Sequence, residues 1–317
     1  MRSFFEDYFS IRISIFLLSI IYCCLIQISE NFIGINLNFH PDSLFYIERA
    51  ENINWNQFKL RYIFYFYIKL VNIKELIIFI NFVLYSITNI QIYDILIKKF
   101  NNKKLFYFLI IFFFIFNPLR AHYAAHILKE TIIIFLLVLL IANRKKFISL
   151  FIIVIGFFFR PAFLIYSLIF IRSTKSKYFI TLIITSIIFF IIQYREVILF
   201  VIFQTNGDMQ FRSFDNIPNF LDLGIKGQIL RSIYWPFLIS TGFFAILSFN
   251  LYFLPIAFYN FFQLSICFYF AKKYQEFFLL FIILSIFAFI VSGFTSFIRY
   301  TLPIMTVLPL IIKIDPK

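Results

Sequence analysis

Long apolar segments recur along the whole chain, and lysine or arginine residues border most of them. Of the 317 residues, 62% are hydrophobic and 14% are charged, whereas about 25% are charged in a typical globular domain. A run of about 20 apolar residues is long enough to cross the hydrocarbon core of a bilayer as a helix, and a helix satisfies its own backbone hydrogen bonds in lipid. The sequence therefore predicts an all-α, polytopic integral membrane protein and excludes a secreted, fibrous or disordered one.

The net charge of +14 is largely gathered in short basic clusters between the apolar segments. In a membrane protein such clusters report orientation, because loops rich in lysine and arginine stay on the cytoplasmic side. We therefore place these clusters inside and expect no nucleic-acid partner. Both termini are then cytoplasmic, and the two sizeable outer loops are residues 30–74 and 204–231. The inner clusters are Arg2 with Arg12 and residues 98–104, 144–146, 172–177, 272–273 and 313–317.

About ten membrane helices fit this arrangement, within a single membrane domain of residues 1–317. Residues 147–171 start and end on the cytoplasmic side, but each half around Arg160 is too short for the ~20 residues of an upright crossing. We expect a tilted hairpin or a re-entrant pair with Arg160 at its tip. Residues 62–71 and 236–250 are expected to lie in the outer interface. The predicted spans are residues 11–28, 75–97, 105–118, 121–142, 178–203, 251–271, 277–292 and 297–312.

The first outer loop supplies two candidate catalytic carboxylates, Asp42 and Glu48. Asp42 follows Pro41 and precedes an expected short helix, which it could cap by accepting backbone N–H bonds. Alternatively Asp42, or Glu48 about two turns further on, acts as a general base at the membrane surface. The sequence leaves both roles open.

A second group of ionisable residues lies near the outer end of the span at residues 121–142. His122, His126 and Glu130 are spaced to share one helix face, a pattern that could hold a metal, but no further ligand is identifiable, and we expect neither a metal nor a cofactor. We instead expect Arg120, His122, Lys129 and Glu130 to form the cationic wall of a substrate pocket, because ionisable groups inside a span are costly and usually functional. The alternative is an ion pair of Glu130 with Lys129 or Arg120.

Arg160 stands beside Pro161 in the middle of an apolar run. An arginine within a membrane span costs at least ~2.5 kcal/mol on insertion scales, so its guanidinium must face a polar cavity or a bound anion. The alternative is a structural ion pair with Glu130.

The second outer loop and the last span carry further cations. The second outer loop supplies Arg212 and Arg231 and is followed by Trp235 and Pro236. Guanidinium groups beside such an aromatic belt suit a lipid-linked phosphate, because they bind phosphate oxygens through two parallel hydrogen bonds. Arg299 and Tyr300 lie at the outer end of the last predicted span. A solvated loop, and side chains that reach for lipid headgroups, are the alternatives to a binding role.

Taken together, these segments resemble the GT-C class of glycosyltransferases and, within it, the Wzy- and EpsG-like polysaccharide repeat-unit polymerases, which include the O-antigen polymerases. One Arg-x10-Gly match, from Arg231 to Gly242, adds to the resemblance. The resemblance extends over most of the chain and lies in the residues PDSLFY at 41–46, Pro118 followed by residues 129–130, residues 160–161 and residues 299–303.

The resemblance implies glycosyl transfer from a sugar carried on undecaprenyl pyrophosphate, at the outer face of the cytoplasmic (inner) membrane. Asp42 would deprotonate the acceptor hydroxyl. Fixed positive charge would stabilise the leaving pyrophosphate, so that no divalent metal is required. The expected partners are polyprenyl-linked sugars, membrane lipid and envelope-polysaccharide assembly proteins. The arginines assigned to the leaving group are Arg160, Arg212, Arg231 and Arg299.

Two other functions stay open at this point. A flippase or transporter of lipid-linked oligosaccharides would share a cationic cavity, but it should carry charges through its spans and show two related halves. A membrane acyltransferase would need a reactive histidine with an acidic partner, and His40 with Asp42 is the candidate pair. A site that opens outward and towards lipid would favour transfer, whereas a central passage would favour transport.

Overall fold

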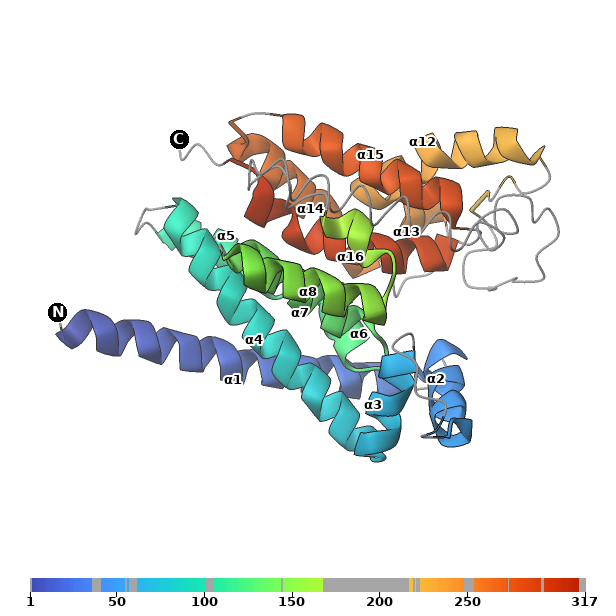
Figure 1. Ribbon diagram of the computed structural model, residues 1–317. Coiled ribbons are helices and arrows are strands. Elements are labelled where there is room, and N and C mark those ends of the chain that lie inside the picture. Colours follow the sequence, from blue (N-terminus) through green and yellow to red (C-terminus); the bar gives the residue numbers. More distant parts are fainter. Residues whose placement is uncertain are drawn as a thin grey trace. The chain divides into compact units, whose positions relative to one another are not determined.

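The computed structural model shows a helical protein (Figure 1). No β-strand occurs among the residues that the structure describes, so the predicted all-α fold is confirmed for them. The described residues are 2–35, 41–54, 56, 62–100, 105–143, 145–167, 217–218, 220, 223–247, 254–272, 274–291 and 294–313.

The chain divides into two compact units, Met1–Phe163 and Leu164–Lys317. That both form a single membrane domain stays a prediction. The first unit contains the helices α1 (Arg2–Phe32), α2 (Pro41–Asn52), α3 (Ile63–Val71), α4 (Lys74–Phe100), α5 (Leu105–Ile115), α6 (Pro118–Ala124), α7 (Glu130–Ala142) and α8 (Lys146–Phe159). The second contains α12 (Ile225–Thr241), α13 (Phe243–Leu247), α14 (Leu254–Phe270), α15 (Gln275–Ile290) and α16 (Phe294–Ile311).

Three described helical segments are long and apolar enough to cross a membrane: Phe9–Phe32, Lys74–Phe100 and Phe106–Ala124. Shorter apolar helices of 10–17 residues follow in both units. These helices support a membrane-embedded protein, whereas the count of ten spans stays a prediction. The predicted span at residues 178–203 lies outside the described residues.

Helix α1 has one buried face and one exposed apolar face. Leu17, Ile21, Leu25 and Ile28 are exposed, and their spacing of three or four residues places them along one side of the helix. The opposite side is buried against α4 and α6 and carries Glu30, which is 2% exposed. An exposed apolar side of this length suits contact with lipid, and the buried side brings a carboxylate into the unit.

Helices α1 and α4 are tied together near the amino end of α1. Arg12 donates from Nε and Nη2 to the carboxylate of Asp94, at 3.2 and 2.5 Å. From Arg12 to Glu30 the rise of an α-helix gives about 27 Å, close to the ~30 Å of the hydrocarbon core. The contacts of Arg12 and Glu30 are therefore separated by about the thickness of the hydrocarbon core.

The predicted continuous helix over residues 121–142 is wrong. Helix α6 ends at Ala124 and α7 begins at Glu130, with a non-helical link between them. Asn117 caps α6, since its Oδ1 accepts the Arg120 N–H at 3.0 Å, and Pro118 occupies the first helical turn. The acidic Glu130 suits the positive end of the α7 dipole, so α7 starts as a separate helix.

Arg160 ends α8, as the sequence predicts for a tip. Its backbone is extended, with φ −155° and ψ 116°, because a residue before proline is disfavoured in the helical region. A turn follows at Pro161, and helical structure resumes at Phe163. The side of the membrane on which this tip lies stays a prediction.

In the second unit, α12 packs against α14 and α15, and α15 packs against α16. Residues 225–231, assigned to the outer loop by the sequence, belong to α12, so Arg231 is a helical residue rather than a loop residue. The helix begins at Ile225 and therefore includes Arg231, whose side chain is buried. Helix α12 ends at Gly242, whose φ of 77° is left-handed.

Candidate functional site

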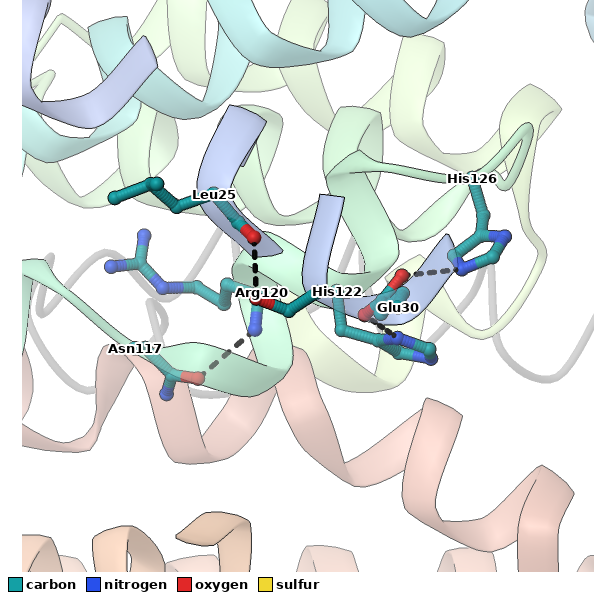
Figure 2. A network of polar contacts seen from close by, with 7 residues as sticks. Leu25, Glu30, Asn117, Arg120, His122 and His126 are labelled. Atoms are coloured by element: carbon teal, nitrogen blue, oxygen red, sulfur yellow. Dashed lines mark hydrogen bonds and ion pairs between the residues drawn. The ribbon is translucent and has the colours of Figure 1, made fainter. Parts of the chain in front are cut away.

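Several buried ionisable groups of the first unit meet around the link between α6 and α7. At its centre the carboxylate of Glu30 lies between two imidazole rings, as Figure 2 shows. Glu30 Oε1 is 2.6 Å from His122 Nδ1, and Glu30 Oε2 is 3.0 Å from His126 Nε2. All three side chains are about 2% exposed. We call Glu30, His122 and His126 the Glu-His-His cluster.

Three elements hold this cluster in place. Glu30 comes from the last turn of α1, His122 from α6, and His126 from the link. Asn81 of α4 donates from Nδ2 to the His126 carbonyl oxygen at 2.9 Å, which fixes the backbone of the link. Burial lowers the pKa of His126, and the hydrogen bond to Glu30 opposes that shift. A neutral His126 ring is therefore favoured at neutral pH.

The expected set of His122, His126 and Glu130 on one helix face is not observed. The helix break places His126 outside any helix, and Glu30, from a distant part of the chain, joins the two histidines instead. Glu130 instead pairs with Arg160.

That pair is buried on both sides. Arg160 Nη2 donates to Glu130 Oε1 at 2.6 Å, with side-chain exposures of 8% and 0%. The structural alternative raised for Arg160 is therefore observed. A role for Arg160 in binding phosphate stays a prediction.

Lys129 projects into a group of three aromatic rings beside this pair. Its Nζ lies 4.9 Å from the ring centroid of Tyr46 and 5.3 Å from those of Phe64 and Tyr65. Lys129 lies in the link, outside the apolar helices. Burial, assisted by the nearby positive charge of Arg160 and opposed by Glu130, lowers its pKa to about 8. Two cations and one carboxylate thus meet, leaving an excess of positive charge at neutral pH.

Helix α2 contributes to the same region through Tyr46. The helix begins at Pro41, so Asp42 lies within its first turn. The capping role required a position just before that turn. A proline at the first helical position explains this start, because its missing N–H costs no hydrogen bond there. The side chain of Asp42 lies outside the described part. Glu48 is exposed on α2, and a base role for either carboxylate stays a prediction.

Arg120 is buried but stands apart from the carboxylates. Its Nη2 donates to Asn89 Oδ1 at 2.9 Å and to the Ile115 carbonyl oxygen at 2.5 Å. Figure 2 shows its side chain extending away from Glu30. Its Nε and Nη1 have no hydrogen-bond partner among the described residues. The expected alternative of a pair between Arg120 and Glu130 is not observed.

No family model matches the sequence, and no curated protein or solved structure is similar to it.

The remaining site candidates belong to the second unit or lie outside the described residues. Arg231 is buried in α12, with its guanidinium carbon 5.1 Å from the centroid of the Trp235 ring. Arg299 is buried in α16. The carbonyl oxygen of Tyr300 accepts the Tyr166 hydroxyl at 2.8 Å. Arg212 lies outside the described residues.

Two residues of the first unit were missed by the sequence reasoning. Glu30 was assigned to the start of the outer loop, although an acidic residue at the end of a long apolar run signals a polar site at that end of the span. Asn89 belongs to an ordinary predicted span, and nothing in the local sequence pattern shows that it accepts a hydrogen bond from the guanidinium of Arg120.

Proposed function

We propose that this protein is a membrane glycosyltransferase that acts on a polyprenyl-pyrophosphate-linked sugar at the outer face of the cytoplasmic membrane. Polymerisation of surface-polysaccharide repeat units is the form of this activity that we favour. The observation that carries the proposal is the placement of Lys129 against three aromatic rings and beside the buried Arg160–Glu130 pair.

Buried charges of this kind are costly for the protein. Ionisable groups at membrane depth are expensive and are usually retained for function. The charges of Arg160 and Glu130 neutralise each other. Lys129 adds a positive charge that contacts three aromatic rings, and burial lowers its pKa. A pyrophosphate would supply the missing negative charge, and it is the anion that a lipid-linked sugar donor brings to this depth.

In the proposed reaction the hydroxyl oxygen of the acceptor sugar attacks the anomeric carbon of the donor. The bond between that carbon and the pyrophosphate oxygen breaks, and the pyrophosphate leaves as an anion. Asp42, or Glu48 on the same helix, accepts the hydroxyl proton. Lys129 and Arg160 stabilise the leaving anion. A substrate contact of Arg120 or His122 stays a prediction, because Arg120 bonds to Asn89 and His122 bonds to Glu30.

Further candidate substrate-binding residues come from residues 164–317. In this proposal Arg212, Arg231, Arg299 and Tyr300 are also substrate-binding groups. The partners are then polyprenyl-linked sugars, the surrounding lipid and envelope-polysaccharide assembly proteins.

Transport of the same lipid-linked sugar is the competing function. A passage through the spans would need polar side chains that face water. In α4 the candidate groups make internal contacts instead, since Asn81 donates to the His126 carbonyl and Asn89 donates to Ser19 Oγ at 2.9 Å. This arrangement supports transfer over transport.

Reconstitution into liposomes tests the proposal. With an undecaprenyl-pyrophosphate-linked donor and an acceptor, the protein should release undecaprenyl pyrophosphate and form a new glycosidic bond, measured by mass spectrometry. Lys129→Met keeps the length and apolar stem of the side chain but removes its charge, so it should lose transfer. Movement of the donor across the bilayer without a new bond would instead establish transport and overturn the proposal.

A further inference from the structure

We infer that the Glu-His-His cluster is a binding site for a divalent transition metal, with Zn²⁺ as the best fit. The inference does not rest on the proposed function, because metal content is measured without any substrate. It rests on the juxtaposition of Glu30, His122 and His126, which the chain brings together from α1, α6 and the link.

The geometry of the cluster suits a metal. One ligand atom from each residue can be chosen so that all three lie within 4.8 Å of one another. Zinc binds imidazole nitrogen and carboxylate oxygen at about 2.0–2.2 Å, which in a tetrahedron separates ligand atoms by about 3.3 Å. The observed contacts of Glu30 with the two rings are 2.6 and 3.0 Å. Opening the two contacts by about 0.7 and 0.3 Å brings them to this separation and makes room for the ion.

The donor set is also chemically selective. Two imidazoles and one carboxylate are typical of zinc sites that keep a fourth position open for water or substrate, and of sites for neighbouring first-row metals. Mg²⁺ and Ca²⁺ prefer all-oxygen ligand sets, so they do not fit. Each ring nitrogen that now faces the carboxylate would turn its lone pair to the metal, and its proton would move to the other ring nitrogen.

Burial strengthens the argument. A carboxylate that is 2% exposed at the end of a membrane helix is costly unless it is paired or coordinates a metal. A divalent ion bound between Glu30 and the two rings would place positive charge directly at the carboxylate. The backbone of His126 is already fixed by the hydrogen bond from Asn81, so a ligand on the non-helical link is held in position.

The test uses the full-length protein, purified in nanodiscs through an affinity tag that contains no histidine. After chelation, the protein is incubated with one equivalent of Zn²⁺ or Co²⁺ and freed of unbound metal, and its content is measured by mass spectrometry. We expect about one metal per chain. The Co²⁺ form should show the strong visible absorption of a tetrahedral site with nitrogen ligands.

Substitutions assign the metal to the cluster. Glu30→Gln keeps the shape and hydrogen-bonding ability of the side chain, and His126→Gln removes one ring. Both should lower the retained metal to below about a fifth of the wild-type amount and abolish the Co²⁺ absorption. His40→Gln removes the remaining histidine of the chain and should retain both signals, so it is the matched control.

Folded wild-type protein that retains no Zn²⁺ or Co²⁺ would overturn the inference and leave a closed hydrogen-bonded cluster. Retention of the full metal content by the double variant His122→Gln/His126→Gln would overturn it as well. Because the first of these outcomes needs only wild-type protein, a variant that fails to fold does not remove the test.

Discussion

Arg160 and Glu130 form a buried ion pair between the end of α8 and the start of α7, with Nη2 2.6 Å from Oε1. Each partner alone would be a charge that the surroundings cannot solvate. Removal of one partner of such a pair is therefore far more damaging than removal of both. This asymmetry separates a structural role of Arg160 from a role in phosphate binding.

We predict that Glu130→Gln destabilises the protein by about 3–5 kcal/mol, because it leaves Arg160 buried without its counter-charge. The double variant Glu130→Gln/Arg160→Met should recover much of that loss, since it removes both charges and keeps the volume. Denaturant unfolding in mixed micelles measures both values. Arg160→Met alone completes the cycle, and a loss in the double variant equal to the sum of the two single losses would show that the two charges are not coupled.

The same double variant, together with Arg160→Lys, decides the functional role of Arg160. A phosphate role predicts protein at normal membrane levels with strongly reduced transfer in both variants, because neither has the two-pronged guanidinium. Transfer at the wild-type rate by the stable double variant would show that the role of Arg160 is purely structural.

The sequence predicted the position of Arg160 well, because Pro161 ends a helix locally and a buried arginine needs a partner wherever it lies. It failed between Ala124 and Glu130, where apolar periodicity continues through a segment that tertiary contacts hold in a non-helical form. The contact of Glu30 with His122 links positions 92 residues apart, and no local pattern encodes such a pairing. Local rules therefore predicted the helices and the charged residues, but not which charges meet.

The pH dependence of anion binding is the second prediction. Because the pKa of Lys129 is lowered to about 8, its ammonium is mostly charged at pH 7 and mostly neutral at pH 9. If only the charged form binds polyprenyl pyrophosphate, the apparent Kd should rise about tenfold at pH 9. Titrations in nanodiscs at several pH values measure this, and Lys129→Arg, which stays charged, should bind equally at both. A wild-type Kd that does not change between pH 7 and 9 would remove Lys129 from the anion site.

The third prediction concerns the general base. Asp42→Asn removes the proton acceptor and should cost little stability, since a charge in the first turn of a helix contributes about 0.3–1 kcal/mol. We expect it to accumulate unpolymerised lipid-linked sugar at normal protein levels, as measured by extraction of the lipid-linked pool. Glu48→Gln is the matched change on the same helix. Loss of transfer in that variant alone would move the base role to Glu48.

The fourth prediction concerns Gly242, to which we assign a structural role rather than a role in the Arg-x10-Gly match. Gly242 has a left-handed φ of 77°, and a Cβ there would lie 2.5 Å from the carbonyl oxygen of Ala257. Gly242→Ala should destabilise the protein by more than the about 1–2 kcal/mol of left-handed strain alone. Gly34→Ala is the control, because Gly34 has φ 80° and no atom within 4 Å of the added Cβ. Equal losses in the two variants, measured by thermal unfolding in detergent, would contradict the close approach.

The last prediction concerns orientation, for which the contacts of α1 provide a structural basis. Arg12 meets Asp94 of α4 at one level of the helix, and Glu30 meets His122 at another, about 27 Å further along. The sequence places Arg12 inside, so Glu30 and the following helix α2 should lie outside, with the basic turn before α8 inside.

Cysteine labelling measures this directly. Cys23, Cys24 and Cys267 carry no disulfide and are first replaced to give a cysteine-free background. Glu51→Cys on α2 and Lys145→Cys before α8 then provide two exposed sites. A membrane-impermeant maleimide should label Glu51→Cys in intact cells with a permeable outer envelope, and Lys145→Cys only after the inner membrane is opened. The predicted topology places three crossings, residues 75–97, 105–118 and 121–142, between α2 and Lys145. Labelling of both sites from the same side would therefore contradict that topology.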